Sequence, residues 1–205
     1  MAESSEHRDV TRRSAVAARL AAFEARIPWP GPQVTIRERR PGAVAAVHGV
    51  SAEGLSAALA AAEGEPEWSP APGSGQAAEC GPLTAMWTGP DQWLLVDATA
   101  TPDALVERLA AVESAGGAVF DVSHARVCLR LRGPAAEPLL ATGCPLDLEA
   151  MPVGGCGASV LGPFTVVVRR LGQESFDLWV ARSYALACVE WLEHEGEAFG
   201  IAPEW

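Results

Sequence analysis

The chain has 205 residues, 49% of them apolar, which is enough for one compact unit with its own hydrophobic core and no disulfide support. A formal net charge of −11 repels phosphate backbones and anionic lipid surfaces, so nucleic acid and membranes are not expected partners. The five scattered cysteines, the polar N-terminal residues and the lack of a run of about 18 apolar residues favour a cytoplasmic protein.

The first fifty residues predict a helix and two strands. Residues 1–13 are polar and are expected to form a flexible N-terminus. Apolar side chains then recur at helical spacing over residues 16–27. Two short apolar runs, at 34–36 and 44–47, have strand character, and the Pro-Gly pair at 41–42 predicts a turn that joins them in a hairpin.

A second helix and a long loop follow. Ser51 is suited to cap a helix that ends at Gly64. Residues 63–80 are rich in proline and glycine and poor in apolar residues, which predicts a surface loop. We expect this loop to divide the chain into an N-terminal α+β half, residues 14–62, and a C-terminal α+β half, residues 81–205.

The centre of the chain predicts a hairpin and a clearly bounded helix. Residues 83–87 and 92–96 have strand character and are separated by the turn sequence Gly89-Pro90-Asp91. Thr101-Pro102-Asp103 predicts the start of a helix. The threonine hydroxyl can accept a hydrogen bond from a free backbone amide, proline fits the first turn, and aspartate complements the positive end of the helix. Gly116-Gly117 ends it.

The last third alternates strands with two helices. Apolar and polar residues alternate over 125–132, which is typical of a half-buried strand with Arg126, Arg130 and Arg132 on its polar face. Glycines at 133 and 143 frame a helix. The remaining predicted elements are strands at 160–161, 165–168 and 176–180 and a helix capped by Ser183. Because the elements lack the regular strand-helix-strand spacing of a doubly wound sheet, the sequence predicts an α+β fold with mainly antiparallel sheets and packed helices.

Asp121, Ser123 and His124 carry the side-chain types of a nucleophilic triad. On an extended chain Asp121 and Ser123 share one face, whereas His124 points to the other, so three near neighbours cannot form the relay. We interpret them as polar residues at a bend, where the phase of the apolar pattern changes between Val122 and Ala125.

Two further patterns resemble a metal site and a phosphate-binding loop, but each lacks residues that such a site requires. Cys144 and Cys156 have no Cys-x-x-Cys partner and no nearby histidine, so they are expected to be buried thiols and not a zinc site. Residues 154–157 are glycine-rich but lack the lysine and hydroxyl of a phosphate loop, and no G-x-G-x-x-G fingerprint for FAD or NAD occurs. The sequence therefore assigns no catalytic, cofactor-binding or metal residue.

The arginines and tryptophans are candidates for contacts with other molecules. Arg126, Arg130 and Arg132 form a positive strip suited to an acidic partner surface or a carboxylate-bearing ligand, although a solvated strand face is the favoured interpretation. Most of the seven tryptophans are expected in the core. Trp68 and Trp205 have no evident core role and are the interface candidates.

Four stretches of the chain form a recognisable series. They are 87–95 (WTGPDQWLL), 121–127 (DVSHARV), 143–148 (GCPLDL) and 176–184 (FDLWVARSY). In order and spacing they resemble the gamma subunit of heterotetrameric sarcosine oxidase over roughly residues 83–200. The resemblance implies an α+β fold similar to the folate-binding, aminomethyltransferase-like proteins.

The resemblance also implies a role. In such a complex, partner alpha, beta and delta subunits are expected to carry FAD, FMN, NAD, zinc and tetrahydrofolate, and sarcosine is oxidatively demethylated to glycine. This chain is then expected to be a non-catalytic, structural subunit that binds no cofactor. Two alternatives stay open: a free-standing tetrahydrofolate-binding or aminomethyl-transfer protein, with Arg126, Arg130 or Arg132 on the glutamate tail, and the small subunit of a related N-methyl amino acid dehydrogenase.

Overall fold

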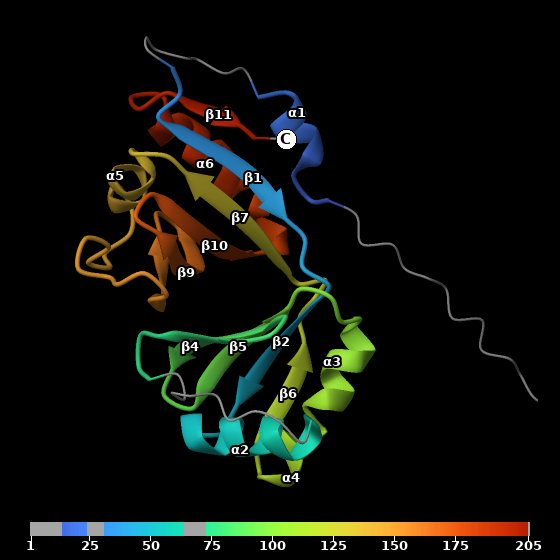
Figure 1. Ribbon diagram of the computed structural model, residues 1–205. Coiled ribbons are helices and arrows are strands. Elements are labelled where there is room, and N and C mark those ends of the chain that lie inside the picture. The colour runs from blue at the N-terminus through green and yellow to red at the C-terminus, as the bar shows by residue number, and fades with distance from the viewer. Residues whose placement is uncertain (1–13, 24–30, 64–72, 205) are drawn as a thin grey trace, which may run out of the picture.

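Two β-sheets form the centre of the molecule in a computed structural model that describes residues 14–23, 31–63 and 73–204 (Figure 1). Within these residues, sheet A contains β1 (Val34–Arg39), β7 (Arg126–Arg132), β8 (Cys156–Leu161), β9 (Phe164–Gly172), β10 (Ser175–Ala181) and β11 (Ile201–Pro203). Sheet B contains β2 (Ala43–His48), β3 (Ala77–Cys80), β4 (Leu83–Gly89), β5 (Gln92–Asp97) and β6 (Ala118–Asp121). The strand orders are β11-β1-β7-β10-β9-β8 and β3-β4-β5-β2-β6, and of the described pairs only β1 with β11 is parallel.

Helices cover the outer face of each sheet. They are α1 (Ala17–Ala21), α2 (Ala52–Glu63), α3 (Pro102–Arg108), α4 (Ala110–Ser114), α5 (Ala136–Ala141) and α6 (Ala185–Gly196), with the short 3₁₀ helix η1 (Arg182–Tyr184) before α6. One apolar cluster joins α1, α5 and α6 to sheet A, and a second joins α2, α3 and α4 to sheet B. A third cluster lies between the sheets, so the layers run helix, sheet, sheet, helix (Figure 1). This architecture confirms the predicted α+β class with mainly antiparallel sheets.

The central strands are buried on both faces, which explains their unbroken apolar runs. In β5, Trp93 and Leu95 pack under the helices of sheet B, whereas Leu94 and Val96 face the other sheet. Strand β7 follows the same rule, because Cys128 packs between the sheets and its neighbours pack under α5 and α6. The prediction of a half-buried strand at 125–132 was therefore wrong at its centre.

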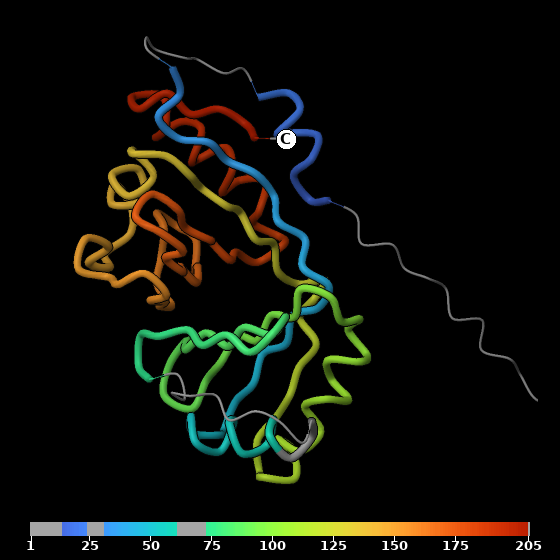
Figure 2. Tube along the Cα trace, viewed as in Figure 1, coloured from blue at the N-terminus to red at the C-terminus, as the bar shows by residue number. Residues whose placement is uncertain are grey.

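The chain crosses from one sheet to the other after β1 and again after β6. Strand β1 pairs with β7 and β11, whereas β2 pairs with β5 and β6, so the predicted hairpin between them was wrong. The Pro-Gly signal marked a real change of direction, but it cannot tell a hairpin from a crossover. A Cβ atom on Gly42 would lie 2.3 Å from the carbonyl oxygen of Ala100, so glycine is required where these segments meet (Figure 2).

The expected loop and halves correspond only in part to the observed elements. Residues 77–80, which we placed in the loop, form β3 because they pair with β4. Residues 64–72 and the expected flexible N-terminus, 1–13, lie outside the described residues. Each sheet takes strands from both sides of the loop, so the predicted halves do not coincide with the two sheets.

Other local signals are confirmed. Strands β4 and β5 form the predicted hairpin, with Asp91 at a φ of 53° in its turn. Thr101 caps α3 by accepting a hydrogen bond from the Ala104 amide at 3.3 Å, and Ser51 accepts one from the Gly54 amide at 3.2 Å. Ser183 instead lies within η1, and no side chain caps α6, so that prediction was wrong.

Candidate functional site

Ser123 is a buried residue at the second crossover, and its hydroxyl is hydrogen-bonded to the backbone. It is 1% exposed, its hydroxyl donates to the Val44 carbonyl at 3.2 Å, and it accepts from the Val44 amide at 2.9 Å. Asp121 accepts a hydrogen bond from the Ser123 amide at 2.8 Å, and His124 is exposed to solvent. The hydroxyl thus joins the two crossovers, and the three side chains do not form a triad.

Replacing Ser123 with alanine is expected to lower the free energy of unfolding by about 1–3 kcal/mol, because the buried Val44 amide loses its acceptor. Urea denaturation followed by tryptophan fluorescence measures this change. The neighbouring His124→Ala variant is the matched control and should stay within about 0.5 kcal/mol of the parent protein. Equal effects of the two substitutions would contradict the structural role of Ser123.

Four of the five cysteines are buried, and Cys80 is partly exposed. The Cys156 thiol donates to the Trp87 carbonyl at 3.5 Å, and the Cys144 thiol to the Ser159 hydroxyl at 3.7 Å. All five cysteines are free, and no group of three His, Cys, Asp or Glu side chains within the described residues is arranged to hold a metal ion. Burial raises the pKa of Cys156 to about 11 and that of Cys188 to about 12, and it also raises the pKa of Cys128.

These pKa shifts predict a graded thiol reactivity. A raised pKa leaves a thiol protonated at neutral pH, and the protonated form is a poor nucleophile. We expect half-exposed Cys80 to react first with a disulfide reagent such as DTNB at pH 7.5, and Cys128, Cys156 and Cys188 only after unfolding. Mass spectrometry of the labelled peptides tests the order, and early labelling of Cys156 or Cys188 would contradict it.

The glycine-rich segment 154–157 is closely packed. A Cβ atom on Gly155 would lie 2.7 Å from the Met151 side chain and 2.8 Å from the Pro152 carbonyl oxygen. Gly154 has a φ of +86°, which disfavours any side chain. The segment runs directly into β8, so it does not open a helix.

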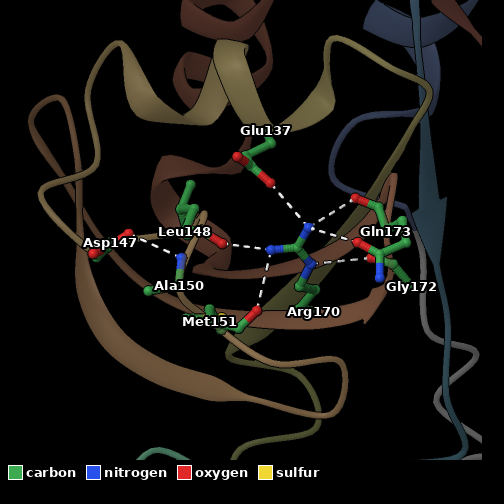
Figure 3. Close-up of polar contacts among 8 residues, drawn as sticks. All are labelled: Glu137, Asp147, Leu148, Ala150, Met151, Arg170, Gly172 and Gln173. Atoms are coloured by element: carbon green, nitrogen blue, oxygen red, sulfur yellow. Dashed lines mark hydrogen bonds and ion pairs between the residues drawn. The ribbon is translucent and has the colours of Figure 1, made fainter.

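The loop before this segment is held by the buried side chain of Arg170 (Figure 3). The Arg170 guanidinium pairs with Glu137 at 3.0 Å and lies 5.3 Å from the centre of the Phe176 ring. It also donates to four backbone carbonyls, those of Leu148, Met151, Gly172 and Gln173. Sequence analysis missed this residue, because its partners are carbonyl groups that no residue type reveals.

Of the three arginines predicted on the polar face of β7, Arg130 lines the space between the sheets. Arg130 forms a two-pronged ion pair with Asp177 of β10, with both N–O distances at 2.7 Å. Arg132 pairs with Glu204 at 3.2 Å, and Arg126 is half-buried with a pKa lowered by burial. The favoured interpretation of a solvated strand face was therefore wrong for Arg130, whose side chain is 14% exposed, whereas the Arg132 side chain is 43% exposed.

A cleft of about 250 Å³ lies between the sheets beside this strip. Its apolar lining includes Met86 and Val96 from sheet B and Cys128 and Trp179 from sheet A. Its charged lining consists of Arg39, Arg40, Arg130, Arg169, Glu79 and Asp177. We take this cleft as the candidate site because charged side chains from both sheets meet in its lining. Apart from Arg130, sequence analysis did not select its charged residues, which come from segments far apart in the sequence.

The tryptophan candidates for an interface stay untested, since Trp68 and Trp205 lie outside the described residues. Tyr184, the last residue of η1, is 57% exposed. It lies against Phe164 at a ring-centre distance of 6.3 Å, and Leu186 nearby is also exposed. No helix among the described residues combines the length and the apolar character needed to cross a membrane.

The two packed sheets with outer helices define an aminomethyltransferase-like fold. The structure of the glycine cleavage system aminomethyltransferase T from Bartonella henselae matches 93% of this chain and 58% of its own chain, with a TM-score of 0.60. The sequence identity is 16%, so this likeness concerns the fold alone. It confirms the fold that the four stretches implied.

Similarity over nearly the whole length identifies the family. The profile of the "Sarcosine oxidase, gamma subunit family" matches residues 42–197. Sarcosine oxidase subunit gamma of Corynebacterium sp. (strain U-96) is 33% identical over 93% of both chains. A chain in the structure of heterotetrameric sarcosine oxidase from Corynebacterium sp. U-96 in complex with pyrrole 2-carboxylate is 31% identical, covers 92% of this chain and 96% of its own, and has a TM-score of 0.76. The chain belongs to the sarcosine oxidase gamma subunit family.

Proposed function

We propose that this chain is the gamma subunit of a heterotetrameric sarcosine oxidase, an oxidoreductase complex, and that its role there is structural. The observation that carries this proposal is the match over 92% of this chain and 96% of a chain in the heterotetrameric enzyme. The same match favours the subunit over a free-standing folate-binding protein.

The side chains suited to chemistry support a structural role. The Ser123 hydroxyl is used in two backbone hydrogen bonds. The thiols of Cys128, Cys156 and Cys188 are protonated at neutral pH because burial raises their pKa values. We assign FAD, FMN, NAD, zinc and tetrahydrofolate to the partner alpha, beta and delta subunits. We also propose that the complex is cytoplasmic.

The four stretches that carry the family resemblance can each be located in the fold. Residues 87–95 form the β4–β5 hairpin, and 121–127 contain the second crossover. Residues 143–148 include Gly143, where a Cβ atom would lie 2.7 Å from the Trp191 ring. Residues 176–184 span β10 and η1. All four thus specify turns and close packing, as expected of a subunit that supplies a folded surface.

The isolated chain provides a direct test. Purified alone, it is expected to show no flavin absorbance near 450 nm and no oxidation of sarcosine. Calorimetric titration with tetrahydrofolate should show no binding in the micromolar range. A bound flavin, turnover of sarcosine, or micromolar folate binding by the lone chain would each contradict the structural role.

A further inference from the structure

The cleft between the sheets is a gap in an otherwise packed interface. Protein interiors leave few voids larger than a water molecule, and 250 Å³ corresponds to roughly eight water molecules at about 30 Å³ each. The third apolar cluster fills the rest of the space between the sheets. The cleft is therefore a formed concavity whose lining combines apolar with charged side chains, as small-molecule sites often do.

The charges around the cleft are mostly neutralised in pairs. Arg130 is paired with Asp177 by two bonds of 2.7 Å, and these side chains are 14% and 8% exposed. Arg169 pairs with Glu79, which joins β9 of sheet A to β3 of sheet B across the cleft. Because both partners of each pair line the cleft, these residues add little net charge to it.

Arg39 is an exception to this pairing of charges around the cleft. It stands at the end of β1 opposite Cys128 of β7, lines the cleft, and forms no ion pair with any residue that the structure describes. Its neighbour Arg40 pairs with Glu38 at 3.1 Å. In a chain of net charge −11, the cleft lining therefore includes a guanidinium without an ion pair among the described residues, together with apolar side chains.

Donors also outnumber acceptors in the surrounding side chains. The ring nitrogen Nε1 of Trp179 and the Nε atom of Arg169 are buried and have no hydrogen-bond partner among the described residues. Both residues line the cleft. Buried donors without acceptors are uncommon, and a shortage of acceptors is what an anionic ligand corrects.

We propose that this cleft binds a small organic carboxylate. The carboxylate accepts hydrogen bonds from the Arg39 guanidinium, which is suited to planar, two-pronged recognition, and the apolar body lies against Met86 and Trp179. The Arg130–Asp177 pair fixes the wall of the site. This binding site goes beyond the structural role in the complex and does not depend on it.

Benzoate is the probe, and benzamide, which has the same shape without the charge, is the matched control. The full chain labelled with ¹⁵N is titrated with each compound and followed by ¹H–¹⁵N correlation spectra. We expect saturable shifts of the Trp179 indole resonance with benzoate, at a dissociation constant of about 1 mM or tighter, and at least tenfold weaker binding of benzamide.

Two variants test whether benzoate binds in the cleft at Arg39. Arg39→Gln, at an exposed position, should keep the dispersed spectrum of the parent and weaken benzoate binding at least tenfold. Arg132→Gln is the control, because Arg132 lies on β7 near Arg130 but pairs with Glu204 and does not line the cleft. Absence of benzoate binding, equal binding of benzamide, or unchanged binding by Arg39→Gln would each overturn the proposal. None of these results bears on whether the chain assembles with partner subunits.

Discussion

Replacing Arg170 with methionine is expected to lower the free energy of unfolding by about 3–5 kcal/mol. The Arg170 side chain is 6% exposed, and its guanidinium joins α5 to the loop before β8 and to the β9–β10 turn (Figure 3). Methionine fills similar volume but leaves the Glu137 carboxylate and four backbone carbonyls without their donor. Equilibrium denaturation in urea, monitored by circular dichroism, measures the loss.

Two control variants separate the contribution of the guanidinium hydrogen bonds of Arg170 from that of its positive charge. Arg170→Lys keeps the charge but offers one nitrogen in place of three, so we expect a loss of about half that of Arg170→Met. Arg40→Met removes an arginine whose side chain is 47% exposed and paired only with Glu38, and it should cost at most about 1 kcal/mol. If Arg170→Met were as mild as Arg40→Met, the loop would have to be held by other contacts.

Replacing Asp97 with alanine is expected to cost about 3 kcal/mol at pH 7. This carboxylate is 1% exposed at the end of β5, accepts hydrogen bonds from the Thr99 and Ala100 amides at 2.8 Å, and pairs with Arg108 at 2.9 Å. It thereby holds the connection from β5 into α3. Asp97→Asn keeps an acceptor for the amides but removes the charge, so it should cost about 1–2 kcal/mol.

The effect of Asp97 should depend on pH. Burial acts to raise the pKa of Asp97, but the bonds from Thr99 and Ala100 and the charge of Arg108 outweigh it, and the pKa in the folded protein is lowered. A lowered pKa stabilises the fold above the unfolded-state value of about 3.9, and this contribution is lost as the pH falls through the folded-state pKa. The difference in unfolding free energy between the parent and Asp97→Asn should therefore shrink below about pH 4. A constant difference from pH 7 to pH 3 would contradict the charged pairing.

Local signals in the sequence predicted local structure well. The Gly89-Pro90-Asp91 turn and the Thr101 cap were found because their physical causes lie within a few residues. The pairing of β1 with β7, in contrast, joins segments some ninety residues apart, and the Pro-Gly turn after β1 carries no information about it. Strand β11 was missed because three residues ending in Pro203 have little strand character without the parallel partner β1.

The candidate site was beyond the reach of sequence patterns for the same reason. Arg130 was selected, but as part of a strip presumed to be solvated, since the alternation on β7 does not show that a second sheet covers that face. Its partner Asp177 lies 47 residues away, and Glu79 lies 90 residues from Arg169. The four stretches that resemble the gamma subunit family lie in the β4–β5 hairpin, at the second crossover, at Gly143 and along β10 with η1.

The proposed role in assembly is tested most directly by leaving this chain out. The proposed alpha, beta and delta partner subunits are co-expressed with and without the chain, and the complex is purified and assayed for flavin content and for sarcosine oxidation. We predict that all four chains co-purify, and that omission of this chain reduces the yield of the assembled, active complex at least tenfold. A three-chain complex that assembles fully and oxidises sarcosine at the full rate would contradict the role proposed for this chain.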